Sequence, residues 1–325
     1  MITLLNTICN KPTTGVLVPL PQNRSYTTML SFLSAEMVPY YLDKSKNWET
    51  ELEAVKGAYK QAKERGTDLS SIQEISLAHA FQLKISKPFF EFAAKERLVI
   101  IADEVYQANI FKERFYSFKR VLRDLQLSYL NKYDNIELAS PHSVSMGITG
   151  EGGQRGGFLE LVGFNSAVQF HIYKLISFTN VCPTTALCLV ELIVNPPREG
   201  SPSYELYKKE NDDIFANLTK ISFALYRTFK KMKGVEFDEP QESMQIFPTI
   251  KLPARFLQVA KKEGQAPDEI YATRLLKATG IYVMPSFFLG QNEGTLRFRA
   301  TPLAFNVELV SVLEKFHNEF IDEFS

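Results

Sequence analysis

The stretch LVIIADEVYQ, residues 98–107, decides the fold class of this chain. Its apolar run, Leu98 to Ala102, is short and continuous and ends in the acid Asp103, a pattern typical of a central strand in a parallel sheet. Similar short apolar runs predict further strands at 16–21, 37–42, 136–143 and 158–164. The sequence therefore predicts a sheet of several strands with residues 98–106 as a buried member.

Helix-length amphipathic stretches alternate with these strands. The clearest is residues 48–66, where Val55 and Tyr59 share one face and Gly66 marks the end. Residues 26–36 have the same period. Alternation of this kind predicts an α/β fold, a mostly parallel sheet flanked by helices on both faces.

The chain also contains one clear linker signal, NPPREGSPS at 195–203. It divides the sequence into a partial large domain, 1–198, and a smaller C-terminal α/β domain, 199–325. In the smaller domain the pattern predicts helices at 203–234, 254–263, 268–279 and from about 305, with short strands between them.

Composition excludes several classes of protein. The 325 residues include 37 basic and 37 acidic side chains, so there is no electrostatic footprint for nucleic acid or an anionic membrane. No apolar run reaches the roughly 18 to 20 residues of a membrane span, and the best, Ala186 to Val194, contains Glu191. Three cysteines make no disulfide scaffold, and the N-terminal stretch resembles neither a secretory signal nor a mitochondrial presequence. We expect a cytoplasmic protein.

Asp103 and Tyr106 are the first candidate site residues. They stand at the carboxyl end of the most apolar strand, the edge at which open α/β sheets bind ligands. A buried carboxylate there needs a cation or hydrogen-bond donors, and a protonated pyridine nitrogen is one such cation. The motif leaves open the alternative that Asp103 is a structural acid in a salt bridge.

The stretch HSVSMGITGEGGQRGG, 142–157, is the second candidate. The hydroxyls of Ser143 and Ser145 precede a glycine-rich loop that contains Arg155. Glycines let backbone amides approach an anion, and arginine binds phosphate through two hydrogen bonds. A flexible surface loop is the alternative, because the spacing fits neither a P-loop nor a Rossmann fingerprint.

Arg299, in LRFRATPL at 296–303, is the third candidate. A strand arginine that faces a cleft binds a carboxylate through two hydrogen bonds. Arg297 lies on the same strand face and is the rival, and an exposed structural arginine is the alternative. The histidines and cysteines have no zinc spacing, and no GxSxG stretch supports a serine triad.

Taken in order, these motifs resemble those of the alanine aminotransferases. The matching stretches are ADEVYQ (102–107), HSVSMGITGEGGQRGG (142–157), VCPTTALCLVELIVNPP (181–197) and GTLRFRATPL (294–303). The resemblance runs from about Val16 to the C-terminus and implies the aspartate-aminotransferase fold with pyridoxal 5′-phosphate as cofactor. It also implies transfer of an amino group between L-alanine and 2-oxoglutarate, in a homodimer with active sites built across the interface.

The resemblance assigns a role to each candidate residue. Asp103 pairs with the pyridinium nitrogen of the cofactor, and Tyr106 bonds the 3-oxygen of its ring. Ser143 and Arg155 bind its phosphate. Arg299, rather than Arg297, binds the substrate carboxylate.

The sequence also departs from the family pattern. Met146 stands where the family has the lysine that forms the Schiff base with the cofactor. Other departures are Asn23 for the stacking tyrosine, IQEISLA (72–78) for the NPGNPTG loop, Phe287 and Phe288 for small residues, and QESMQ (241–245) for QGAMY. The family's N-terminal section, with its own phosphate-binding turn, is expected to be absent, because the chain begins where the family is already inside its large domain.

Met146 carries the most chemical weight among these changes. A thioether has no titratable proton and does not condense with an aldehyde, so the sequence predicts a catalytically inactive, degenerate member of the family. Three functions remain open: an active aminotransferase, an inactive paralogue that binds a vitamin-B6 phosphate or an amino acid, and a decayed chain that pairs with an intact aminotransferase subunit.

Overall fold

In a computed structural model the chain divides into two compact units, Met1–Ser201 and Pro202–Ser325. The structure describes residues 1–9, 13–22, 24–43, 50–75, 82–110, 115–148, 150–179, 182–240, 246–286 and 296–325, with the backbone alone at 72–75 and 82–86. The first unit ends near the proline-rich stretch from which the sequence predicts a linker.

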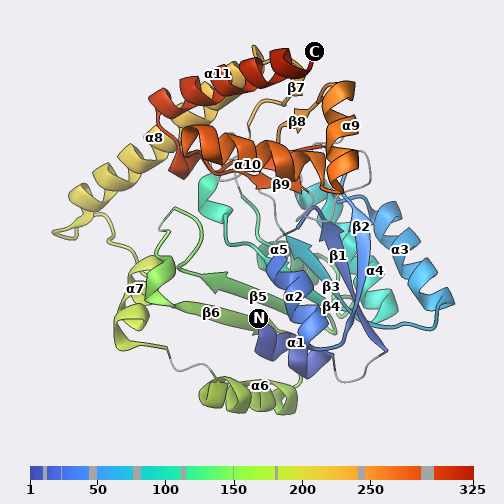
Figure 1. The fold of residues 1–325 in the computed structure, drawn as a ribbon. Coiled ribbons are helices and arrows are strands. Elements are labelled where there is room, and N and C mark those ends of the chain that lie inside the picture. Colours follow the sequence, from blue (N-terminus) through green and yellow to red (C-terminus); the bar gives the residue numbers. More distant parts are fainter. Residues whose placement is uncertain are drawn as a thin grey trace. The chain divides into compact units, whose positions relative to one another are not determined.

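The first unit is built on a six-stranded sheet of order β2-β1-β3-β4-β5-β6 (Figure 1). Its strands are β1 (Thr14–Leu20), β2 (Glu36–Tyr41), β3 (Asp68–Ile75), β4 (Val99–Asp103), β5 (Leu138–Ser143) and β6 (Gly157–Val162). β1 to β5 run parallel, and β6 is antiparallel to β5. The predicted α/β class with a mostly parallel sheet is confirmed.

Alternate residues of the strands pack on opposite faces of the sheet, which is why the central strands read as continuous apolar runs. Leu17 and Ile100 face one core and Val18 and Ile101 the other, and all four are almost fully buried. The first core is covered by α3 (Leu52–Glu64), α4 (Gln82–Glu96) and α5 (Phe118–Ser128). The second is covered by α1 (Ile2–Ile8), α2 (Arg24–Phe32) and α6 (Ser166–Thr179).

The turn that follows β4 is fixed by an acid of the ADEVYQ motif. Glu104 is buried, and its Oε1 accepts a hydrogen bond from the backbone N–H of Phe118, 2.9 Å away, at the first residue of α5. Ser117 caps the same helix by accepting from Arg120 N at 3.2 Å. Of the two adjacent acids, Glu104 therefore stabilises the fold and Asp103 remains for the site.

Several elements of the first unit were not predicted from the sequence, and β3 is the most important. It lies between β1 and β4, and its residues from Ile72 onward were aligned with the NPGNPTG loop of the family. The serines and charged residues of DLSSIQEI do not predict a strand. The segment forms one because its backbone pairs with β1 on one side and β4 on the other, and this pairing outweighs its low local β propensity. The remaining helix, α7 (Thr184–Val194), has eleven residues. None of the helices in the described ranges is long and apolar enough to cross a membrane.

The second unit consists of helices with two short antiparallel ribbons. Its elements are α8 (Tyr204–Phe229), β7 (Val235–Glu236), β8 (Thr249–Ile250), α9 (Ala254–Glu263), α10 (Pro267–Thr279), β9 (Met284–Pro285), β10 (Phe298–Arg299) and α11 (Val307–Phe324). The four predicted helices are confirmed. Gly264 and Gly280 end α9 and α10 in the left-handed conformation, which favours glycine.

Aromatic rings fill the core of the second unit. Phe256 packs edge-on against Phe320 and Phe324, with ring centres 4.9 and 5.0 Å apart, and Tyr271 stacks on Phe298. Such pairs contribute about 0.5–1.5 kcal/mol each beyond the burial of their area.

A buried hydrogen-bonded chain crosses this core. His317 is fully buried, and its Nε2 lies 2.7 Å from the carbonyl of Lys233, which only accepts, so Nε2 carries the proton. Its Nδ1 therefore accepts from the hydroxyl of Tyr271 at 3.0 Å. Burial lowers the pKa of His317, so the neutral ring is the stable form.

Candidate functional site

Asp103 is the last residue of β4 and the centre of the candidate site. The hydroxyl of Tyr26, on α2, donates a hydrogen bond to its Oδ2. Its Oδ1 is shielded from solvent and has no hydrogen-bond partner within the described part of the chain, although the residue as a whole is only half-buried. Burial raises the pKa of this carboxyl, while the bonds from Tyr26 and the backbone of Val105 act in the opposite direction.

The side chains of Tyr106 and Met146 are in contact near the end of β4, the strand that ends at Asp103. Tyr106 is buried in the turn after β4, and its hydroxyl donates to Met146 Sδ at 3.5 Å. Met146 follows β5, the neighbouring parallel strand, so two adjacent strand ends deliver these side chains to one edge of the sheet.

The next residue, Gly147, explains why the two loops lie so close. Its backbone is left-handed with φ of 77°, and a Cβ there would lie 2.9 Å from the carbonyl oxygen of Val105. A side chain at position 147 would push the loop after β5 away from the loop after β4. The contact between Tyr106 and Met146 therefore depends on this glycine.

Ser143 ends β5, and its Oγ accepts from the backbone N–H of Ser145 at 3.1 Å. The glycine-rich loop beyond it is folded back by backbone bonds from Val144 N to Gly156 O and from Glu151 N to Val144 O. Except at position 149, which lies outside the described residues, this loop is therefore a hydrogen-bonded turn rather than a loose surface segment.

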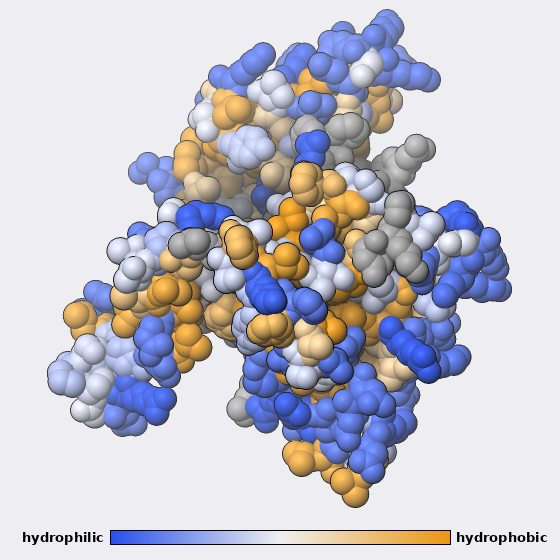
Figure 2. All heavy atoms as spheres, turned by 90° about the horizontal axis from the view of Figure 1, so that it is seen from below, coloured by the Kyte–Doolittle hydropathy of each residue, from blue (hydrophilic) through white to orange (hydrophobic). Residues whose placement is uncertain are grey.

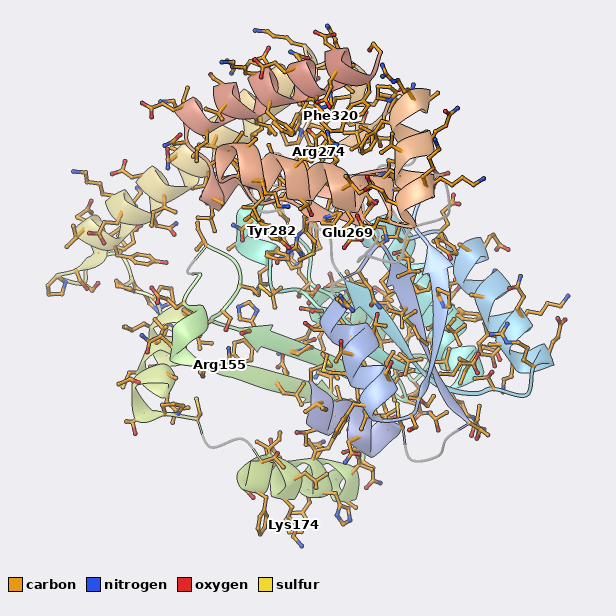
Figure 3. The ribbon with its side chains drawn as sticks, in the orientation of Figure 1. Arg155, Lys174, Glu269, Arg274, Tyr282 and Phe320 are labelled. Atoms are coloured by element: carbon orange, nitrogen blue, oxygen red, sulfur yellow. The ribbon has the colours of Figure 1, made fainter. Side chains whose placement is uncertain are left out.

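Arg155 lies in that loop and is exposed (Figure 3). Its backbone is left-handed, with φ of 59°, and its Nη1 donates to the carbonyl of Gly152 at 3.1 Å. The structure thus brings Asp103, Tyr26, Tyr106 and Met146 to the strand ends and places the Arg155 guanidinium on its own loop.

Arg299 belongs to the second unit, where the structure separates it from its rival. The guanidinium of Arg297 is partly buried and donates through Nε to Thr249 Oγ1 at 3.1 Å, and burial lowers its pKa. For Arg299, the described residues show no side-chain hydrogen bond or ion pair. Arg297 is thus bonded within its own unit, and the assignment of Arg299 to a substrate carboxylate stays a prediction.

Sequence reasoning assigned no role to Tyr26, the partner of Asp103. Its signal is weak, because it lies on a helix that follows β1, far from ADEVYQ along the chain. The departures at Asn23, residues 76–78, residues 241–245, Phe287 and Phe288 lie outside the described residues.

Comparisons with known proteins agree on the family. The sequence model of the family described as aminotransferase class I and II matches residues 1–312. The chain is 40% identical over 327 residues to the mitochondrial alanine aminotransferase of Saccharomyces cerevisiae, covering 99% of this chain and 55% of that protein. It is 37% identical to a protein of the same yeast described as an inactive alanine aminotransferase, covering 99% of this chain and 64% of that protein.

A solved structure described as an alanine aminotransferase from Pyrococcus furiosus shares the fold, with a TM-score of 0.76 and 17% identity, over 99% of this chain and 74% of that one. The chain thus spans a little over half to two thirds of the yeast relatives' length. With the family model matching nearly its whole length, the chain belongs to the aminotransferase class I and II family.

Proposed function

We propose that this chain does not catalyse transamination between L-alanine and 2-oxoglutarate, although it belongs to an aminotransferase family. One observation carries the proposal: Met146 Sδ accepts a hydrogen bond from Tyr106 at 3.5 Å, at the edge of the sheet beside Asp103. Met146 stands where the resemblance places the lysine that binds the cofactor covalently.

A thioether does not replace an amine in this reaction. It has no titratable proton and does not condense with an aldehyde, so Met146 supports neither covalent attachment nor proton transfer at the substrate carbon. Within the described chain, no lysine or arginine contributes to the pKa shift of Asp103. The relative described as an inactive alanine aminotransferase supports the same view.

The described residues fit the ring end of pyridoxal 5′-phosphate. Asp103 Oδ1 is a buried acceptor in need of a donor, and a protonated ring nitrogen supplies one. Tyr106 would bind a ring oxygen, and Ser143 and Arg155 would bind the phosphate once the Arg155 guanidinium leaves the carbonyl of Gly152. When bound, this cofactor supplies an electron-withdrawing ring that stabilises negative charge on a bonded substrate carbon.

A second candidate function is a non-catalytic subunit that pairs with another copy or with an intact aminotransferase. Large apolar side chains on α6 and α7 favour it: Phe170, Phe178 and Leu192 are 58%, 91% and 59% exposed. Hydrophobic side chains are also visible among the polar ones on the face that Figure 2 shows. Exposed apolar clusters mark association surfaces.

The test of inactivity is turnover of alanine and 2-oxoglutarate at saturating pyridoxal 5′-phosphate. We expect none from the wild type or from Met146→Leu, a control of similar size without an amine. Met146→Lys should give a borohydride-trapped adduct on position 146 but turnover far below that of an intact family member, because the other departures remain. Measurable wild-type turnover would refute the proposal.

The test of pairing is sedimentation of the full chain, alone and mixed with an intact alanine aminotransferase. Phe178→Asp should weaken any complex that uses α6, while Leu130→Asp, a substitution at another highly exposed apolar position, serves as the control. A monomer in both mixtures at all concentrations tested removes this second candidate.

A further inference from the structure

The strand β6 forms an open edge of the six-stranded sheet (Figure 1). It pairs with β5 on one side, and no strand in the described ranges pairs with its other side. Its register with β5 runs without a shift from Gly157 to Val162, so no bulge bends it away, and it contains no proline. Its single charge, Glu160, is bonded to Lys119 of α5. An edge that lacks a bulge, a proline and a free charge is a template for another strand.

The opposite edge of the sheet, β2, is protected by contrast. Pro39 lies within it and lacks the backbone N–H that an added strand needs. Glu36, the first residue of β2, is bonded to Arg65 and Thr67, which brings polar side chains to that end of the strand. Of the two edges, β6 is therefore the one on which another strand fits.

The pairing of β6 with β5 determines which of its backbone groups face outward. Val144 N donates to Gly156 O at 3.1 Å, and successive pairs of an antiparallel ladder alternate between hydrogen-bonded and non-hydrogen-bonded. Pro141, which has no N–H, lies opposite Leu159, where this alternation places a non-hydrogen-bonded pair. The residues whose N–H and C=O groups point away from β5 are therefore Gly157, Leu159 and Leu161.

We propose that β6 pairs with β6 of a second copy of this chain, antiparallel and about a twofold axis at Leu159. The inference rests on the second candidate function proposed above and names its partner and its strand. With the axis at Leu159, the outward groups of Gly157 bond those of Leu161 in the other copy, and Phe158 lies opposite Glu160. An axis at Glu160 would set two like charges opposite each other, which destabilises a sheet. The strand is thus complementary to itself when the axis lies at Leu159.

Apolar side chains extend this edge into a wider surface. Leu159 and Leu161 are half-buried against the second core, so pairing joins the apolar rows of two copies on the same face of the sheet. Ala186 lies against Gly156, just before β6, and is the one fully buried residue of the mostly apolar helix α7. A stable interface buries about 800 Å² on each partner, more than a six-residue strand edge supplies, and the exposed side chains of α7 add to it.

The experiment is sedimentation of the full chain over a range of concentrations, with two variants at Phe158, a side chain that is 40% exposed. Phe158→Lys sets a positive charge opposite Glu160 of the other copy, and Phe158→Glu sets a negative one. Both variants lose the same ring, so their difference reports the charge across the axis. Because this pair occurs twice in the dimer, we expect Phe158→Lys to dimerise about tenfold more tightly than Phe158→Glu. Phe32→Lys and Phe32→Glu, at an exposed ring of α2, are the matched controls and should not differ.

Hydrogen exchange of single amides in the wild type gives a second readout. The amides of Leu159 and Leu161 should exchange slowly where the chain is dimeric and rapidly after dilution. The amides of Phe158 and Glu160, which face β5, should exchange slowly under both conditions. Alternate protection along one strand is produced by edge pairing and not by a contact through helices alone.

The outcomes separate this inference from the proposed function. A chain that is monomeric at every concentration, or that pairs with an intact aminotransferase but not with itself, overturns the inference. A dimer that Phe178→Asp weakens, but in which the Phe158 variants do not differ and the amides of Leu159 and Leu161 stay rapid, overturns it and leaves pairing through α6. If the Phe158 variants do not fold by circular dichroism, the exchange pattern of the wild type still decides. Wild-type turnover refutes the proposed inactivity alone.

Discussion

The buried polar groups of the two units differ in how they are hydrogen-bonded. In the second unit, Ser286 Oγ donates to Asp268 Oδ2 at 2.7 Å and accepts from Arg297 N, and His317 bridges Tyr271 and Lys233. In the first unit, Asp103 Oδ1 and Gln22 Oε1 are buried at or near the strand ends without a hydrogen-bond partner in the described chain, and so are the hydroxyls of Ser70 and Ser71 within β3. An unpaired buried acceptor costs about 1–3 kcal/mol.

The second unit has an unpaired group as well, because Ser222 Oγ is buried on α8 without a partner among the described residues, but an unpaired neutral hydroxyl costs less than an unpaired carboxylate oxygen. The bonds of Asp268, Ser286 and His317 lie within the second unit, as expected of a structural region. The edge of the first unit retains Asp103 in a form that is costly unless something else supplies a donor. The following predictions test this contrast.

The largest expected effect is in the aromatic core. Phe256→Ala removes a fully buried ring that contacts Phe320 and Phe324, and should lower the free energy of unfolding by about 3–5 kcal/mol. Urea denaturation measures it. Phe178→Ala, at a ring that is 91% exposed, is the matched control and should change the same quantity by less than about 0.5 kcal/mol. Equal effects would mean that the exposed ring is packed in solution.

The second effect is a pH dependence of the second unit. The pKa of His317 is lower in the folded chain than its ordinary value of 6.5, so below about pH 6.5 the unfolded chain binds a proton that the folded chain does not. Stability should therefore be complete above pH 6.5 and fall as the pH decreases, by at most about 1.4 kcal/mol per pH unit from this group.

Urea denaturation at pH 7.5, 6.0 and 5.0 measures this dependence. His317→Gln removes one titrating ring and should reduce the slope, leaving the part that comes from His142, whose pKa burial also lowers. His171→Gln, an exposed histidine of the first unit, should leave the slope unchanged. An unchanged slope in His317→Gln would show that another group controls it.

The third effect distinguishes the two acids of ADEVYQ. Glu104→Ala leaves the backbone N–H of Phe118 without its buried acceptor and should destabilise the chain by about 1–3 kcal/mol. Glu151→Ala, at an exposed acid, provides the reference. Thermal unfolding followed by circular dichroism gives the difference, and a loss no larger than that of the reference would deny Glu104 its structural role.

The smallest effect has the opposite sign. Burial raises the pKa of Asp103, so the ionised carboxylate is disfavoured in the folded chain. Asp103→Asn should therefore leave the free energy of unfolding unchanged or increase it by up to about 1 kcal/mol. The same denaturation experiment measures it. A destabilisation of several kcal/mol would make Asp103 a structural acid, the alternative that the sequence leaves open, and would weaken the contrast between the units.

The sequence predicts much of this molecule because its strongest signals are local. The continuous apolar run before Asp103 predicts β4, and helical periodicity predicts α9 and α10 within a residue. The polar residues of β3 conceal a central strand, since its stability comes from pairing with β1 and β4 rather than from its own pattern.

The residues of the candidate site divide in the same way, into those that a local motif predicts and those that depend on tertiary contacts. Asp103 and Tyr106 are predictable because both belong to one short motif at the end of a strand. Tyr26 is not, because its bond to Asp103 joins positions 77 residues apart and exists only once α2 has packed against the sheet. The placement of Arg155 on its own loop is likewise a tertiary fact, set by backbone bonds that sequence spacing does not encode.

The bond between Tyr106 and Met146 gives the chain a built-in spectroscopic probe. A methionine methyl group gives a sharp carbon-13 NMR signal, and aromatic ring currents shift the resonances of nearby methyls. Met146 is one of seven methionines, so the loss of one peak in a Met146→Leu sample assigns it. Any molecule that displaces the sulfur from the tyrosine hydroxyl moves that peak, so Met146 makes occupancy of the site directly observable.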